Sequence, residues 1–298
     1  MKNSKNLPDW LVEVVEKTRN QYSPGEETDY SATSLIVPPM IYALEKKYQP
    51  EDDVNDALSA FLGTAMHDKI EEHLKDNPRY LVEQRYYKKI HVPDSPTKKD
   101  FVISAQIDLY DKETKTLSDH KLSKLYSFQH EKEEYEIQLN IQAWLLRDHG
   151  YNPQYLRING FAKDWGATSV GRSKDYPESM YIPVSFPLWE DEDVEAYIRN
   201  SILEKEYAKL GQMIICTDKQ RWARPASYKV KRKGRKTAIR CFDTQEAAEE
   251  YINNMKKPTG KEYIEYVPGE DVRCKHYCKV NKYCNYYIER YGDGEENS

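Results

Sequence analysis

The chain has 298 residues and a formal net charge of −5 at pH 7, so it is long enough for one large domain or two smaller ones. Its acidic balance excludes a uniformly basic surface, and any contact with a nucleic acid would have to be a local patch. No run approaches the ~18 apolar residues of a membrane span, and the first residues, MKNSKNLPDW, lack the apolar core of a signal peptide. We therefore expect a soluble, cytoplasmic protein without membrane contact.

Hydrophobic periodicity predicts alternating helical and extended segments. In chain order these are a short helix with a polar arm over 1–33, helices over 39–48 and 54–74, strands over 80–91, 101–111 and 116–121, a helix over 131–149, a strand over 155–164, a helix over 191–210, a basic strand-like stretch over 228–242 and a helix over 244–255. Thr244 is the expected N-cap of the last helix. The helix over 131–149 is expected to bury one stripe, made of Ile137, Ile141, Trp144 and Leu145.

The strand over 101–111 and the next strand carry two aspartates that the turn between them would align. A four-residue loop from Lys112 to Lys115 pairs residue 111 with 116, and counting back then places Asp108 opposite Asp119. Directly opposed side chains lie about 4.5–5.5 Å apart at Cβ, so two carboxylates there repel each other unless a cation intervenes. Mg²⁺ or Mn²⁺ suits such an oxygen-rich site. Lys121 projects from the same face as Asp119, where it would orient a water or stabilise negative charge.

A carboxylate two residues before a lysine is not specific by itself. Glu45/Lys47 and Glu113/Lys115 show the same spacing, which is also typical of a solvated charge pair. The opposed Asp108 is the additional observation that favours a metal site.

Five motifs follow one another along the chain. They are SATSLIVPP at 31–39, GTAMHDKIEEHL with His67, AQIDLY with Asp108, LSDHKLSK with Asp119 and Lys121, and YEIQLNIQAWLL with Gln138. In this order they resemble the RecB-like branch of the PD-(D/E)XK nucleases, the branch that includes CRISPR-associated exonucleases. The resemblance covers residues 31 to about 160. It departs at Gln142, where the family often has tyrosine. It implies a restriction-endonuclease-like α/β core, in which a mixed central sheet is flanked by helices.

The resemblance implies a role for each matched residue. His67, Asp108 and Asp119 would bind the divalent metal, and the main-chain carbonyl of His120 would add a ligand. Lys121 would activate the water. Gln138 would support the site. Glu83, on the preceding strand, is interpreted as a group behind the metal ligands, with a plain surface charge as the alternative.

Three clustered cysteines, Cys274, Cys278 and Cys284, have the spacing C-x3-C-x5-C. In an intracellular chain such clustering favours metal ligation over disulfides, and sulfur sites suit zinc or an iron–sulfur cluster. Many relatives implied by the resemblance carry a [4Fe–4S] cluster, although here the first gap is one residue longer and the usual early cysteine is absent. Cys216 is the candidate fourth ligand, and Zn²⁺ is the alternative cofactor. Cys241 lies on an alternating segment and is predicted to be core.

Seven basic residues fall between positions 229 and 240. If that segment stays extended, one face presents Lys229, Lys231, Lys233 and Arg235. Neutralisation of DNA phosphates is the functional interpretation, and a solvated hairpin tip is the alternative.

Together these features predict four parts: an N-terminal arm (1–30), the nuclease core (31–214), a basic and cysteine-cluster module (215–291) and a disordered acidic tail (292–298). The expected activity is that of a Mg²⁺- or Mn²⁺-dependent DNA exonuclease acting at DNA ends in recombination or repair. The resemblance further implies a phage-encoded protein in the host cytoplasm, with a recombination or annealing protein as candidate partner. The alternatives are an endonuclease of the same fold, a non-catalytic DNA-binding protein, and a zinc-containing interaction module.

Overall fold

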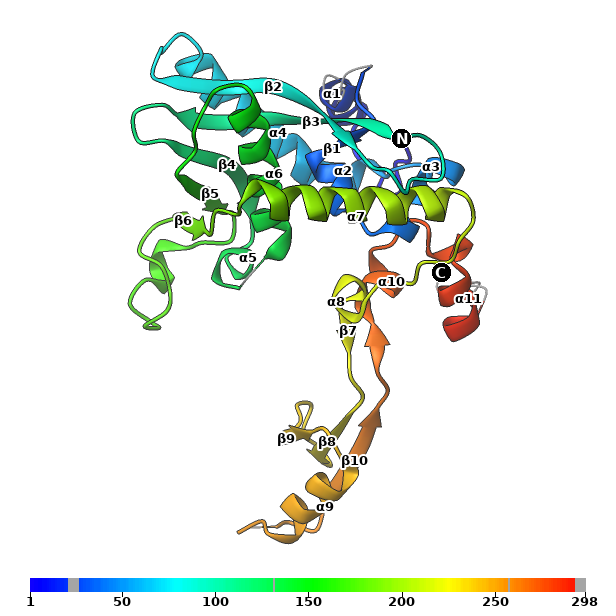
Figure 1. The fold of residues 1–298 in the computed structure, drawn as a ribbon. Helices are drawn as coiled ribbons and strands as arrows, with labels where there is room; N and C mark the ends of the chain where they lie inside the picture. Colours follow the sequence, from blue (N-terminus) through cyan, green and yellow to red (C-terminus); the bar gives the residue numbers. More distant parts are fainter. Residues whose placement is uncertain (21–26, 131, 257, 293–298) are drawn as a thin grey trace. The chain divides into compact units, whose positions relative to one another are not determined.

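The computed structural model describes residues 1–20, 27–130, 132–256 and 258–292, and divides the chain into two compact units (Figure 1). Unit 1 comprises Met1–Ala43 and Gln49–Gln212, and unit 2 comprises Leu44–Tyr48 and Met213–Ser298. The division after Gln212 lies two residues before the predicted end of the core at 214. Of the predicted acidic tail, 293–298 lies outside the described residues. No helix among the described residues is both long and apolar enough to cross a membrane.

Unit 1 is built on a six-stranded mixed sheet. Its strands are β1 (Tyr30–Ser31), β2 (Tyr80–His91), β3 (Asp100–Asp111), β4 (Thr116–Ser123), β5 (Tyr155–Ala162) and β6 (Tyr181–Phe186). The order is β1-β3-β4-β5-β6, and β2 pairs with β3. The β1–β3 and β4–β5 pairs are parallel, whereas the other pairs are antiparallel. The predicted α/β class with a mixed central sheet flanked by helices is therefore confirmed.

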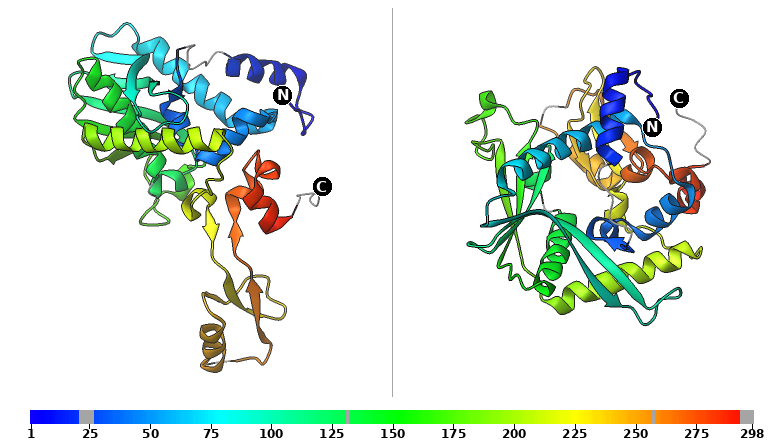
Figure 2. Two further views of the ribbon diagram at one scale, coloured as in Figure 1. Left: turned by 45° about the vertical axis from the view of Figure 1, so that its right-hand side comes forward. Right: turned by 90° about the horizontal axis from the view of Figure 1, so that it is seen from above.

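The helices of unit 1 follow the predicted periodicity closely. They are α1 (Asp9–Asn20), α2 (Ala32–Ile36), α3 (Pro39–Tyr48, whose last residues belong to unit 2), α4 (Val54–Leu74), α5 (Tyr126–Gln129), α6 (Glu133–Asp148) and α7 (Asp191–Lys209), with a short 3₁₀ turn at Ala167–Ser169. Helix α7 is the long yellow-green helix in Figure 2. Every residue of α6 from Ile137 to Leu146 is buried, because α6 contacts both the sheet and α7. The single predicted stripe was therefore too narrow.

Unit 2 has a three-stranded antiparallel sheet and a cysteine-bearing segment. Its elements are α8 (Asp218–Arg221), β7 (Ala223–Arg224), β8 (Ser227–Arg232), β9 (Arg240–Phe242), α9 (Gln245–Asn253), β10 (Glu262–Val267), β11 (Glu270–Asp271), α10 (Val272–His276), a 3₁₀ turn (Asn281–Tyr283) and α11 (Asn285–Tyr291). The strand order is β10-β8-β9, and β7 pairs with β11. Thr244 caps α9 as predicted, since its hydroxyl accepts a hydrogen bond from the Ala247 amide at 3.2 Å.

The basic stretch over 228–242 is not one continuous strand, which corrects the prediction. Strand β8 ends at Arg232, and the chain turns at Gly234, whose φ of +88° is readily adopted only by glycine. The amide of Arg235 closes this turn on the carbonyl of Arg232 at 2.9 Å. Arg235 therefore does not continue the face that carries Lys229 and Lys231.

Helix α7 carries a buried lysine, Lys205, whose protonation should make the unfolding free energy of unit 1 depend on pH. The Lys205 ammonium is 1% exposed and donates hydrogen bonds to the Leu35 carbonyl at 2.9 Å and to the Ser201 hydroxyl at 2.7 Å. Burial lowers the pKa of Lys205 to about 7, although Glu204 opposes the shift. Because the unfolded chain holds this proton up to a pKa of about 10.4, the contribution of Lys205 to folding improves as pH rises from about 7 to about 10.

We therefore expect the difference in unfolding free energy between Lys205→Met and the wild type to depend on pH. Relative to the wild type, the variant should be more stable at pH 6.5 than at pH 9.5, by about 1–3 kcal/mol. Urea unfolding of both proteins at the two pH values measures this difference, in which other titrating groups cancel. A difference that stays constant with pH would contradict the assignment of a depressed pKa to Lys205.

Candidate metal and nuclease site

The candidate site lies where strand β3 changes neighbours. Its ladder with β4 ends at the pair Leu109↔Ser118, and β1 pairs with β3 only at Ile103 and Ser104. Between these contacts a cavity of about 590 Å³ opens. It is lined from five elements and the β1–α2 junction, including Ser31, Ala32, Thr64, His67, Glu83, Arg85, Gln106, Asp108, Lys121, Gln138 and Gln142.

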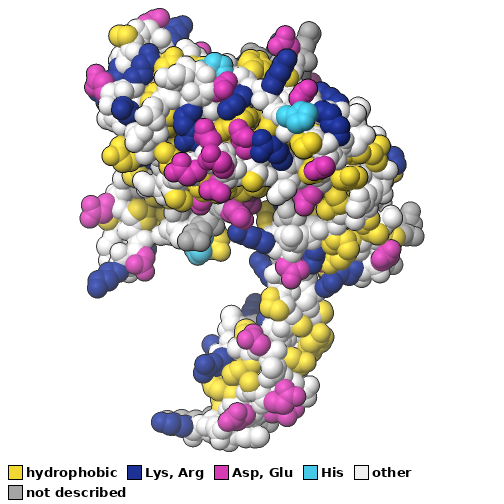
Figure 3. Space-filling view, viewed as in Figure 1, with side chains coloured by type: hydrophobic (Ala, Val, Ile, Leu, Met, Phe, Trp, Pro, Cys, Tyr) yellow, Lys and Arg dark blue, Asp and Glu magenta, His cyan; other side chains and the backbone are white. Residues whose placement is uncertain are grey.

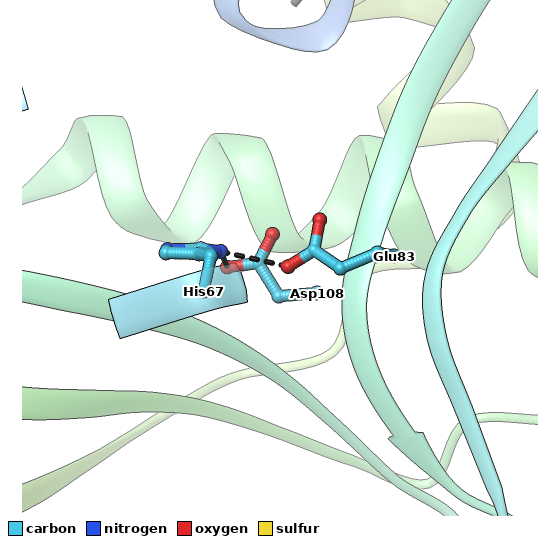
Figure 4. A group of neighbouring side chains, drawn as sticks. All are labelled: His67, Glu83 and Asp108. Atoms are coloured by element: carbon cyan, nitrogen blue, oxygen red, sulfur yellow. Dashed lines mark hydrogen bonds and ion pairs between the residues drawn. The ribbon is translucent and has the colours of Figure 1, made fainter. Parts of the chain in front are cut away.

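Three side chains from α4, β2 and β3 meet in this cavity: His67, Glu83 and Asp108 (Figure 4). Their ligand atoms lie within 4.8 Å of one another. His67 Nδ1 is 2.8 Å from Glu83 Oε1 and 3.7 Å from Asp108 Oδ2. One nitrogen and two carboxylates form a donor set that suits a divalent cation. His67 and Asp108 are ligands predicted from the sequence, whereas Glu83 was expected behind the ligands.

Glu83 enters this group through an unusual backbone conformation. The pairs Val82↔Leu109 and Gln84↔Ile107 bracket it, so its register position is opposite Asp108. Its φ is +49°, in the left-handed region that a non-glycine residue adopts at a cost of about 1–3 kcal/mol. Such strain persists only where the surroundings hold it. Here Gln106 Nε2 donates to Glu83 Oε2 at 2.6 Å, in addition to the His67 contact.

The register predicted for the acidic hairpin is confirmed as far as the ladder extends. Asp111 pairs with Thr116 and Leu109 with Ser118, which puts Asp108 and Asp119 at the next position, where the strands part. Asp119 is 1% exposed. Its Oδ1 accepts a hydrogen bond from Gln138 Nε2 at 2.6 Å, and its Oδ2 lies 2.6 Å from Lys121 Nζ. Gln138 and Lys121 therefore hold Asp119 in place.

The electrostatics of the cavity indicate an excess of buried negative charge. Burial raises the pKa of Asp108, and the charge of Asp119 raises it further. Burial opposes charge on His67, but the hydrogen bond to Glu83 and the charge of Asp108 outweigh it and raise the pKa of His67. The pKa of Lys121 is also raised, because Asp119 and Asp108 outweigh its burial. Protons on Asp108 and His67 thus offset the negative charge of the carboxylates. A divalent cation would offset the same charge and would displace these protons.

His120 contributes its main chain to the site and keeps a neutral side chain. Its amide donates to Asp108 Oδ2 at 2.7 Å, and its carbonyl oxygen lies 3.2 Å from His67 Nε2. That carbonyl therefore lies beside His67, and its role as a metal ligand stays a prediction. Burial lowers the pKa of the His120 imidazole to about 4, with His67 as the next cause, and Asn159 donates to its Nδ1 at 3.2 Å.

Four of the five cysteines are partly buried in unit 2: Cys216, Cys274, Cys278 and Cys284. Burial raises the pKa of Cys216 to about 11, and Cys284 and Cys278 raise it further. The pKa of Cys274 is raised to about 12 by burial, by Asp271 and then by the other three thiols. Among the described residues, however, no three cysteine sulfurs lie within 4.8 Å of one another.

Cys241, predicted to be core, is exposed. It registers opposite Lys229, whereas its neighbour Phe242 contacts the ring of Tyr251 on α9. The helix covers one face of the small sheet, and strand alternation turns Cys241 to the other face.

The predicted basic patch is reduced in the structure. The Lys231 ammonium lies 2.7 Å from Glu265 across the β8–β10 pair. Lys229, opposite Cys241, and Lys231 lie on the face away from α9, whereas Lys233 and Arg235 follow the end of β8 at Arg232. On unit 1, Figure 3 shows acidic side chains gathered over the start of α7, whose first turn holds Asp191, Glu192 and Asp193. That acidic region is unsuited to a polyanion.

Comparisons with known proteins identify no family for this chain. No family model matches it, and no curated protein matches. A solved structure described as SSO0001 is similar at 17% sequence identity, covering 64% of this chain and 82% of that chain with a TM-score of 0.46.

Proposed function

We propose that unit 1 is a metal-dependent DNA nuclease of the PD-(D/E)XK type, RecB-like, which hydrolyses phosphodiester bonds at DNA ends. The observation that carries this proposal is the convergence of Glu83, Asp108 and Asp119 with His67 and Lys121 in and around one open cavity. Three carboxylates close together in a buried site need a cation. A lysine beside them is suited to the negative charge of a reacting phosphate.

The residues that would hold Mg²⁺ or Mn²⁺ are His67, Asp108 and Glu83, with Asp119 and the His120 carbonyl next to them. When bound, the ion would act as a Lewis acid at the phosphate and lower the pKa of the attacking water. Lys121, held by Asp119 at 2.6 Å, would orient that water and stabilise the charge that develops on the phosphate oxygens. Gln138 keeps Asp119 in place through its 2.6 Å hydrogen bond.

For unit 2 we propose a structural [4Fe–4S] cluster held by Cys216, Cys274, Cys278 and Cys284. The thiols act on one another electrostatically, so they share one region. Thiolate ligands suit both an iron–sulfur cluster and zinc. The resemblance of the motifs favours the cluster, and zinc is the second candidate.

DNA contact by unit 2 belongs to the same proposal, with a smaller residue set. Lys229 and Lys233 are the candidates for phosphate neutralisation, because neither forms an ion pair among the described residues, although Glu265 registers opposite Lys229. Lys231 is partly neutralised by Glu265. Action at DNA ends in recombination, with a recombination or annealing protein as partner, rests on the resemblance of the motifs.

The test is incubation of the purified protein with end-labelled linear duplex, linear single-stranded and closed circular DNA, with and without Mg²⁺ or Mn²⁺. We expect metal-dependent loss of the linear substrates, and a loss of this activity in Asp119→Ala and Lys121→Ala. Nicking of closed circles would replace the exonuclease with an endonuclease. Binding without cleavage under any metal, by protein prepared without oxygen, would leave a non-catalytic DNA-binding role.

A further inference from the structure

Two positions of the β2–β3 ladder face the cavity and carry opposite charges. They are two residues apart on β2. Glu83 lies opposite Asp108 at the first position, and Arg85 pairs with Gln106 at the second. Residues two apart on a strand share a face and lie about 6.6–6.8 Å apart. An acidic position that suits a metal is therefore followed, on the same face, by a position with a cation and an amide.

Arg85 is held by neutral groups. Its Nη1 donates to Ser104 Oγ at 3.2 Å and its Nη2 donates to Gln106 Oε1 at 3.0 Å. Within the described part of the chain, no carboxylate lies within ion-pair distance of Arg85, although this half-buried guanidinium lines the same cavity as Asp108. By contrast, Arg79 on the chain leading into β2 is paired with Asp111.

The neighbours of Arg85 fix its position without neutralising its charge. Gln106 accepts from Arg85 through one side-chain atom and donates to Glu83 through the other. Ser104 is fully buried, and its hydroxyl oxygen also accepts from Thr28 at 2.9 Å. A guanidinium has five donors, and these contacts use two of them, so donors remain for a ligand in the cavity.

We propose that Arg85 binds a DNA phosphate next to the one that is hydrolysed, and so sets the position of the strand in the site. This proposal rests on the nuclease function of unit 1. A planar guanidinium suits two oxygens of one phosphate, and a cation one ladder position from the metal group offsets the carboxylates that would repel a polyanion. Lys121, on β4 across β3 from Arg85, remains with the reacting phosphate.

The experiment measures DNA binding and cleavage separately for Arg85→Ala and Arg85→Lys. Lys89→Ala is the matched control, because Lys89 is an exposed cation on the same strand that does not line the cavity. Binding of a labelled oligonucleotide is followed with Ca²⁺ in place of Mg²⁺ over a range of salt concentrations. Cleavage with Mg²⁺ yields kcat and KM.

We expect Arg85→Ala to weaken binding and raise KM about tenfold, to change kcat less than about threefold, and to reduce the salt dependence of binding by about one phosphate contact. Arg85→Lys should recover part of the affinity, because it keeps the charge and loses the two-pronged geometry. Lys89→Ala should leave KM unchanged.

An unchanged KM and an unchanged salt dependence in Arg85→Ala would overturn the proposal. A loss of kcat and thermal stability without a change in KM would also overturn it, because that result indicates a structural role. The nuclease function of unit 1 and the role of Arg85 are refuted by different results. A wild type that does not cleave DNA refutes the nuclease function, whereas a wild type that cleaves while Arg85→Ala retains its KM refutes only the role of Arg85.

Discussion

Asp108→Asn is expected to reduce metal-dependent DNA cleavage by at least ~10³-fold in kcat, about 4 kcal/mol of transition-state stabilisation. The carboxylate of Asp108 belongs to the only three-residue group among the described residues whose ligand atoms all lie within 4.8 Å. An amide is a weaker ligand for a hard cation and brings no negative charge. Initial rates on linear DNA at saturating Mg²⁺ measure the loss.

The same substitution should raise the thermal stability of the metal-free protein. Burial, and next the charge of Asp119, raise the pKa of Asp108 to about 8, above its ordinary value of about 3.9, so the free energy of unfolding falls as pH rises from about 4 to about 8. Asparagine removes the charge, and its oxygen can still accept the His120 amide, now at 2.7 Å from Asp108 Oδ2. We expect a Tm gain that is larger at pH 8 than at pH 5.

Magnesium should reverse this order of stability, because the ion stabilises only the protein that binds it. Asp100→Asn is the matched control, since Asp100 is an exposed aspartate on the same strand. It should change neither activity nor the response to Mg²⁺. Cleavage by Asp108→Asn within tenfold of the wild type would exclude Asp108 as a metal ligand.

Cys278→Ser is expected to remove the iron–sulfur cluster and to destabilise unit 2. Cys278 is the middle cysteine of the C-x3-C-x5-C set, so its substitution removes one of the four candidate ligands. Because the free energy of metal binding contributes to folding, a unit of this size should lose more than ~10 °C in its unfolding transition. Iron and labile-sulfide analysis with calorimetry, on protein prepared without oxygen, measures both effects.

Cys241→Ser provides the control for this second prediction. Cys241 is an exposed thiol on β9, opposite Lys229, and its substitution should leave iron content and the unfolding transition unchanged. If the wild type contains zinc instead of iron and Cys278→Ser loses it, the four ligands stand and the iron–sulfur cluster is rejected. Unchanged metal content in Cys278→Ser would reject the ligand set itself.

Several parts of the fold and the candidate site were predictable because they depend on contacts close in sequence. The bounds of α3, α4 and β2 follow from the periodicity of their side chains. The alignment of Asp108 with Asp119 follows from a four-residue loop, which sets the register of an antiparallel pair. Local patterns of this kind carry their own geometry, since a helix repeats every 3.6 residues and a strand every two.

Other features depend on which segments meet, and no local pattern contains that information. Glu83 joins the candidate metal group because β2 pairs with β3 in a register that places it opposite Asp108, at a backbone angle that its own sequence does not favour. The same pairing puts Arg85 in the cavity. Cys241 is exposed because α9 covers the opposite face of its sheet.

The sequence by itself therefore determined most helices and strands of unit 1 and the acidic hairpin, and it named the cysteine ligands as candidates, because spacing along the chain controls those relations. Only the tertiary structure decided that Glu83 faces His67 and that Arg85 lies in the cavity with no carboxylate partner among the described residues. The physical reason is that strand pairing and burial are set by the packing of the whole unit. These determine the neighbours and the charge balance of each side chain.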